Sequence, residues 1–240
     1  MKKAFTLAEV LITLGIIGVV AAMTLPALIS NYNNKIYINQ LKKSYSTFSQ
    51  GMQKMFAEYN CPDWACMGMS DDNLNDKNYM MDMFSRAFSM ADKNTNSGKI
   101  DYVTKIYDAG TDTALSANDY LFSFNLPDGS SWYYFGTLFY SNEFVVVVDI
   151  NGKKKGPNKV GRDVFGMTLT AKGVMAPIFS RNHWKAICSS PVSGHECNAE
   201  EMADAYDAAM RSDCSKNGAQ ENSYISCFNR ILLDDWEVNY

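Results

Sequence analysis

The feature that most constrains this chain is a long apolar segment close to its N-terminus. Between Phe5 and Ile29, 18 of 25 residues are Ala, Val, Ile, Leu, Met or Phe. A helix of that length rises about 38 Å, which exceeds the hydrocarbon core of about 30 Å in a bilayer. The segment therefore predicts a membrane-spanning helix. Lys2 and Lys3 on its short flank favour a cytoplasmic N-terminus and export of the remaining chain.

An acidic residue, Glu9, lies inside this apolar segment. An ordinary signal peptide, for which Val20-Ala21-Ala22 offers a cleavage site, does not need such a residue. A carboxylate within a membrane is costly and indicates a function, with a positive charge as its expected partner. No Lys or Arg occurs between Lys3 and Lys35, so we expect the cation to come from another molecule.

The residues around Glu9 resemble a known N-terminal signature. A short basic leader, a Phe, a Glu four residues later and an unbroken apolar helix are combined in Lys2-Lys3-Ala4-Phe5-Thr6-Leu7-Ala8-Glu9-Val10-Leu11-Ile12. This combination resembles the start of type IV prepilins and type II secretion pseudopilins. The family usually has Gly before the cleaved bond, where this chain has Ala4, the next smallest side chain.

The resemblance implies a processing and assembly route. A prepilin peptidase would cut between Ala4 and Phe5 and methylate the new amine of Phe5. Glu9 would then pair with the Phe5 amine of a neighbouring subunit in a filament. Other pilin-like subunits, an inner-membrane assembly platform and membrane lipid are the further partners that it implies. The implied fold is α+β and pilin-like, with the long N-terminal helix packed on an antiparallel sheet and a disulfide-stapled C-terminal lobe.

Beyond the membrane segment the helical pattern continues. Apolar residues recur every three or four positions, as one face of an amphipathic helix requires: Ile38, Leu41, Tyr45, Phe48, Met52, Met55 and Tyr59. This pattern predicts a helix that ends at about Glu58. Pro26 either kinks the helix or ends its membrane-spanning part, and the sequence leaves both alternatives open.

The rest of the chain predicts a small sheet and a disulfide-rich end. We expect a short helix over residues 77–90 and strands over residues 120–126, 131–139, 143–150 and 164–170. The run Phe144–Val148 predicts a strand buried on both faces. Further helices are expected near residues 198–210 and 223–233, followed by an extended end over residues 236–240. The expected regions are a leader (1–4), a membrane-spanning helix (5–29), an amphipathic continuation (30–58), a polar connecting region (59–117), a sheet (118–178) and a C-terminal lobe (179–240).

Six cysteines fall in three sequence-local pairs: Cys61 and Cys66, Cys188 and Cys197, Cys214 and Cys227. An even number in an exported chain predicts disulfides, although the sequence does not fix their connectivity. A zinc site at Cys188, His195 and Cys197 lacks a fourth ligand at a recognisable spacing.

A glycine-rich segment carries three oxygen donors, Asp149, Asn151 and Asp163. They form a weak calcium candidate, since Lys153 stands where an EF-hand has its third ligand and the distal Glu is absent. A network of Asx turns is the favoured interpretation. No other metal and no cofactor is expected.

Composition and motifs exclude other functions. The net charge of −4 gives no basic field for nucleic acid, and no catalytic motif is present. A nucleophile at Cys188 with His183 or His195 would need a reduced thiol, against the export prediction. We therefore expect a structural filament subunit and not an enzyme. The alternative is a membrane-tethered or secreted binding module that does not polymerise; the sequence does not separate a pilus from a secretion pseudopilus or a DNA-uptake filament.

Overall fold

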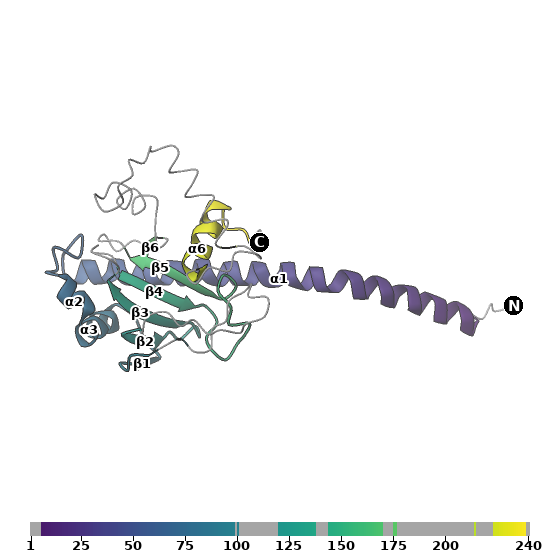
Figure 1. Ribbon diagram of the computed structural model, residues 1–240, viewed down its shortest axis with the longest axis horizontal. Coiled ribbons are helices and arrows are strands. Elements are labelled where there is room, and N and C mark those ends of the chain that lie inside the picture. The colour runs from purple at the N-terminus through teal and green to yellow at the C-terminus, as the bar shows by residue number, and fades with distance from the viewer. Residues whose placement is uncertain are drawn as a thin grey trace, which may run out of the picture.

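A computed structural model describes residues 6–98, 100, 120–137, 144–169, 175–176, 214 and 223–238. Its dominant element is α1, a helix of 52 residues from Leu7 to Glu58. The helix continues through Pro26, so the proline does not end it. Figure 1 shows the N-terminal half of α1 leaving the folded head and sloping away from the axis of the packed half.

The two halves of α1 differ because their sequences differ. Large apolar side chains between Leu7 and Ile29 are at least 45% exposed. From Ile38 onward the predicted apolar stripe turns inward, and Leu41, Phe48 and Met52 are fully buried. The helix ends at Glu58 as the sequence predicts, and the disulfide Cys61–Cys66 closes the turn that follows.

The head contains a six-stranded antiparallel sheet with its strands in sequence order. The strands are β1 (Asp92–Asn94), β2 (Phe122–Asn125), β3 (Ser131–Thr137), β4 (Phe144–Asp149), β5 (Val164–Leu169) and β6 (Met175–Ala176). All six residues of β4 are buried, which confirms the prediction from its continuous apolar run. Two short helices precede the sheet, α2 (Asp71–Asn75) and α3 (Lys77–Ala87).

Aromatic rings join α1 to the sheet. The Phe48 ring stacks on Trp132 of β3 with centroids 4.7 Å apart, and it also lies 4.9 Å from the ring of Phe88. A Cβ atom added at Gly51 would lie 2.2 Å from the Phe88 ring, so this glycine permits the close approach. The antiparallel sheet packed on one long helix confirms the predicted α+β, pilin-like fold.

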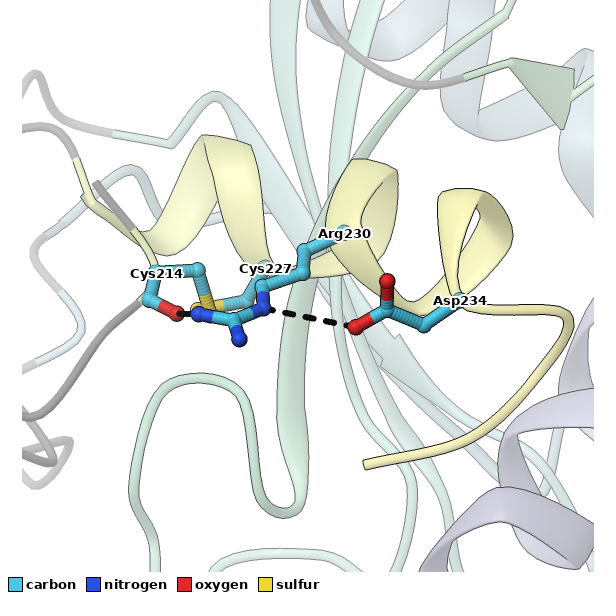
Figure 2. Close-up of a disulfide and its surroundings, with 4 residues drawn as sticks. All are labelled: Cys214, Cys227, Arg230 and Asp234. Atoms are coloured by element: carbon cyan, nitrogen blue, oxygen red, sulfur yellow. Dashed lines mark hydrogen bonds and ion pairs between the residues drawn. A yellow bond between two sulfur atoms is a disulfide. The ribbon is translucent and has the colours of Figure 1, made fainter. Parts of the chain in front are cut away.

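The face of the sheet that points away from α1 carries a second buried cluster over β3, β4 and β5. Tyr133, Val147 and Val164 pack there in one buried cluster with Cys214 and Cys227. Cys227 lies on α6 (Ser223–Leu233), the last helix, and Figure 2 shows its disulfide with Cys214.

An arginine of α6 reinforces this connection. Arg230 Nη1 donates a hydrogen bond of 2.5 Å to the carbonyl of Cys214, and Arg230 Nε lies 3.5 Å from a carboxylate oxygen of Asp234 (Figure 2). The disulfide and the arginine together attach α6 to Cys214. Cys188, Cys197, the expected helix near residues 198–210 and the last two residues of the expected extended end lie outside the described residues.

Some predicted boundaries were wrong. The helix expected over residues 77–90 ends at Ala87, because Phe88 leaves the helical conformation and buries its ring against Phe48 and Phe124. The sequence analysis also missed α2, β1 and β6, which are five, three and two residues long.

Candidate assembly site at the start of the long helix

Glu9 takes part in a capping box at the first turn of α1. Thr6 is the N-cap residue, and its Oγ1 accepts a hydrogen bond of 3.3 Å from the backbone N–H of Glu9. In return, Glu9 Oε2 accepts hydrogen bonds from the Thr6 backbone N–H at 2.9 Å and from Thr6 Oγ1 at 2.8 Å. This reciprocal arrangement satisfies donors that the first turn of a helix otherwise leaves unpaired.

The capping box gives Glu9 polar partners within its own chain, which the sequence analysis did not foresee. The described part of the apolar segment contains no Lys or Arg that could pair with Glu9. The two donors to Glu9 are a neutral amide and a neutral hydroxyl, so they satisfy hydrogen bonds and leave the negative charge uncompensated. The signal was present in the sequence, since Thr followed three residues later by Glu is a capping-box pattern.

The capping box lies directly beside the expected cleavage point. Ala4 and Phe5 are outside the described residues. The Thr6 N–H that donates to Glu9 belongs to the peptide bond between Phe5 and Thr6. A cut before Phe5 would therefore release a positive amine one residue from the Glu9 partner. This proximity in sequence is fixed by covalent structure alone.

The surface beyond Glu9 is apolar and has no partner within the described part of the head. The helix is long and apolar enough to cross a membrane, judged by length and composition, and none of its most apolar stretch is buried. Nothing lies within 4 Å of a Cβ atom added at Gly15 or Gly18. Such glycines allow close approach of a second helix, so lipid or neighbouring helices can cover this surface.

The calcium candidates come together in one turn network. Asp149 Oδ1 accepts the N–H groups of Asn151 at 3.3 Å and Gly152 at 2.8 Å. Asp163 accepts the N–H groups of Asn158 at 2.8 Å and Lys159 at 2.7 Å.

These donors occupy carboxylate lone pairs that a bound cation would need. Burial raises the pKa of Asp163, and the hydrogen bonds from Lys159, Asn158 and Asn151 oppose that rise. Carboxylates that already face N–H donors are poorly arranged for a cation, so the geometry favours the turn network. Among the described residues no group of three or more His, Cys, Asp or Glu side chains is placed to hold a metal ion.

An antiparallel sheet carried on a long helix, with an exposed apolar half and an acid at its start, defines a pilin-like architecture. The family model for the prokaryotic N-terminal methylation motif matches residues 1–25. This motif is the signature of type IV pilin and pseudopilin precursors. Comparison with curated proteins and with solved structures gives no match.

The motif supports one general class of function. It supports a type IV pilin-like or pseudopilin subunit, a structural and not an enzymatic class. Proteins with this motif typically assemble with other pilin-like subunits after processing by a prepilin peptidase. Together with the apolar half of α1, the motif fits a single-pass membrane-anchored pilin.

Proposed function

We propose that this chain is the precursor of a structural subunit in a filament of the type IV pilus or type II secretion pseudopilus class. Its leader is removed between Ala4 and Phe5, and the new Phe5 amine is methylated. The observation that carries the proposal is the exposed apolar half of α1, which continues without a break into the folded head. The methylation motif over residues 1–25 supports the processing step.

Before assembly, the apolar half of α1 lies in the membrane and the head is on the exported side. Leu7–Ile29 rises about 34 Å, enough to cross the hydrocarbon core. Extraction by an inner-membrane assembly platform moves this surface from lipid to the helices of neighbouring subunits. Because the apolar surface is too large to remain in water, the subunit passes directly between these two environments and ends in a periplasmic or extracellular filament.

Glu9 selects the correct register during this transfer. In the membrane its carboxylate accepts hydrogen bonds from Thr6. In the filament it pairs with the Phe5 amine of a neighbour, which supplies a full positive charge within the same low-dielectric layer. The Thr6 donors carry no net charge, whereas the amine adds a full opposite charge, whose Coulomb attraction to the carboxylate is stronger in a low-dielectric layer than in water, so the pairing favours the assembled arrangement.

Substitution of Glu9 tests the proposal. Glu9→Leu should insert into the membrane as well as the unsubstituted chain but should be lost from filaments sheared from cells. Thr13→Leu is the matched control, because it also replaces an exposed polar residue one turn later on α1, and it should assemble. Normal incorporation of Glu9→Leu into filaments would count against the mechanism.

Intact mass and N-terminal sequencing of the native protein test the processing step. The expected mature start is N-methyl-Phe5, and Ala4→Glu should accumulate as the unshortened precursor. A mature start at Met23 would instead indicate ordinary secretion.

The second candidate function is a membrane-tethered binding module that does not polymerise. One observation favours this alternative: the capping box gives Glu9 a role inside a single chain. On this alternative Thr6→Val and Glu9→Leu would have equal and local effects on the first turn of α1. No sheared filament would contain the protein under any condition of expression.

A further inference from the structure

The connection between β4 and β5 is strongly basic. Residues 151–162 contain five basic side chains and no acidic one: Lys153, Lys154, Lys155, Lys159 and Arg162. We call this segment the cationic loop. Its charge contrasts with that of the whole chain, which is −4. Neither the head fold nor the assembly role of α1 explains this concentration of charge.

Buried acids hold the cationic loop in a defined shape. The side chains of Asp149 and Asp163, one at each end of the loop, are fully buried and accept hydrogen bonds from its backbone. Asn158 Nδ2 donates a hydrogen bond of 3.0 Å to the carbonyl of Lys153 and closes the loop on itself. Lys154 and Lys155 are exposed. The acids therefore face inward while these two lysines face solvent.

The cationic loop contacts α1 close to the end of its apolar half. Arg162 Nη1 donates a hydrogen bond to Oδ1 of Asn34. Asn34 follows Ile29 by five residues, which corresponds to about 7.5 Å along a helix. The polar headgroup layer is about 5–8 Å thick on each side of the hydrocarbon core. With Leu7–Ile29 spanning that core, Arg162 lies at the level of the lipid headgroups.

One further basic residue, Lys35, lies at the same level of α1. Lys35 is exposed beside Asn34. A cavity of about 500 Å³ beside it lies between α1 and residues 236–238, and its lining includes Lys35, Asn31 and the acidic Glu237. Figure 1 places the connection between β4 and β5 at the end of the head from which the exposed half of α1 leaves.

We propose that the cationic loop and Lys35 bind the anionic headgroups of phospholipids in the leaflet from which α1 emerges. Lysines near an anionic membrane surface are attracted to it within about a Debye length, roughly 8–10 Å at physiological salt. The contact holds the head against the membrane before assembly, and extraction into a filament breaks it. The inference rests on the membrane-spanning role of α1 in the proposed function, but it does not require polymerisation.

Hydrogen–deuterium exchange of the full chain in nanodiscs tests the inference. One set of discs contains phosphatidylcholine alone, and the other contains phosphatidylcholine with 30% phosphatidylglycerol. Backbone amides of residues 151–162 should exchange at least threefold more slowly in the anionic discs, and 0.5 M NaCl should remove the difference. The double substitution Lys154→Glu with Lys155→Glu should also remove it while leaving the thermal unfolding of the head unchanged.

The matched control reverses two lysines elsewhere on the head, Lys54 and Lys77, with the same change in net charge. Lys54 lies about 37 Å beyond Ile29 along α1, and Lys77 begins α3. This variant should keep the slow exchange in anionic discs. Exchange that is equal in both lipids, or that slows only after subunits assemble into filaments, would overturn the inference.

Insertion of α1 is measured in the same samples by resistance to alkaline extraction. A chain that does not insert would refute both the proposed function and this inference. An inserted chain whose loop is indifferent to lipid charge would refute the inference alone.

Discussion

Removing the Cys214–Cys227 disulfide should weaken the head more than removing Cys61–Cys66. The two bonds differ in the length of chain that they close, 13 residues against 5. They also differ in surroundings. Cys214 and Cys227 are buried in the cluster that covers the second face of the sheet, whereas Cys66 is exposed beside the end of α1.

The difference in stability follows from loop closure. A disulfide lowers the conformational entropy of the unfolded chain, and the effect grows with the length of the loop. This relation gives about 3 kcal/mol for the loop of 13 residues and about 2 kcal/mol for the loop of 5 residues at 25 °C. Replacement of Cys214 and Cys227 by Ala also leaves a small cavity in a buried cluster, which enlarges the difference.

Urea unfolding of the oxidised full chain in detergent micelles measures this difference. Fluorescence of the buried Trp64 and Trp132 reports the unfolding of the head. The variant lacking Cys214–Cys227 should lose at least 1 kcal/mol more free energy of unfolding than the variant lacking Cys61–Cys66. An equal or larger loss in the latter variant would show that loop length and burial do not determine the contribution of these bonds.

Three further predictions concern the core, the pH dependence and the start of α1. Phe48→Ala removes the ring stacked on Trp132 and should lower the free energy of unfolding in urea by about 3–5 kcal/mol. Burial raises the pKa of Asp128, but hydrogen bonds from Ser130 and the attraction of Lys43 outweigh the effect of burial, so the pKa is lowered overall. The ionised Asp128 therefore stabilises the head above the unfolded pKa of about 3.9, and this stabilisation is lost as pH falls through the lower folded pKa. Asp128→Asn should therefore reduce the loss in free energy of unfolding that urea titration measures between pH 4 and pH 2. Thr6→Val should speed amide exchange in the first turn of α1 in micelles without changing the unfolding of the head.

Periodicity in the sequence was sufficient to predict the long elements. In α1 the inward stripe from Ile38 onward repeats every three to four residues and ends where the helix ends. In β4 five consecutive apolar residues have no polar face to expose, and the structure buries both of their faces. These patterns extend over enough residues that no local interaction competes with them.

The short elements could not be predicted in the same way. Helix α2 has five residues, and it begins where the Ser70 side chain accepts a hydrogen bond from the Asn73 N–H. Strand β1 is exposed along its whole length, so it lacks the alternation of apolar and polar residues that identifies a strand. Its position depends on pairing with β2, which is a property of the folded sheet.

The candidate assembly site was predicted only in part, for a related reason. A hydropathy argument detects Glu9 because a charge stands out in an apolar segment, but it does not detect the hydroxyl of Thr6. The structure shows that the acid has two neutral donors within its own chain. Burial of Glu9 in the membrane is therefore less costly than the sequence analysis assumed, because the carboxylate is not without hydrogen bonds.

The capping box allows the two roles of Glu9 to be separated by one conservative substitution. Gln at this position preserves the capping box, since Gln and Glu both serve there, but it cannot form a charged pair with a neighbouring amine. Glu9→Gln should therefore keep normal amide exchange in the first turn of α1 and still be depleted from sheared filaments, measured against Thr13→Leu as before. Normal assembly of Glu9→Gln would show that Glu9 acts only through its hydrogen bonds to Thr6, and the filament register would then depend on the apolar surface of α1 alone.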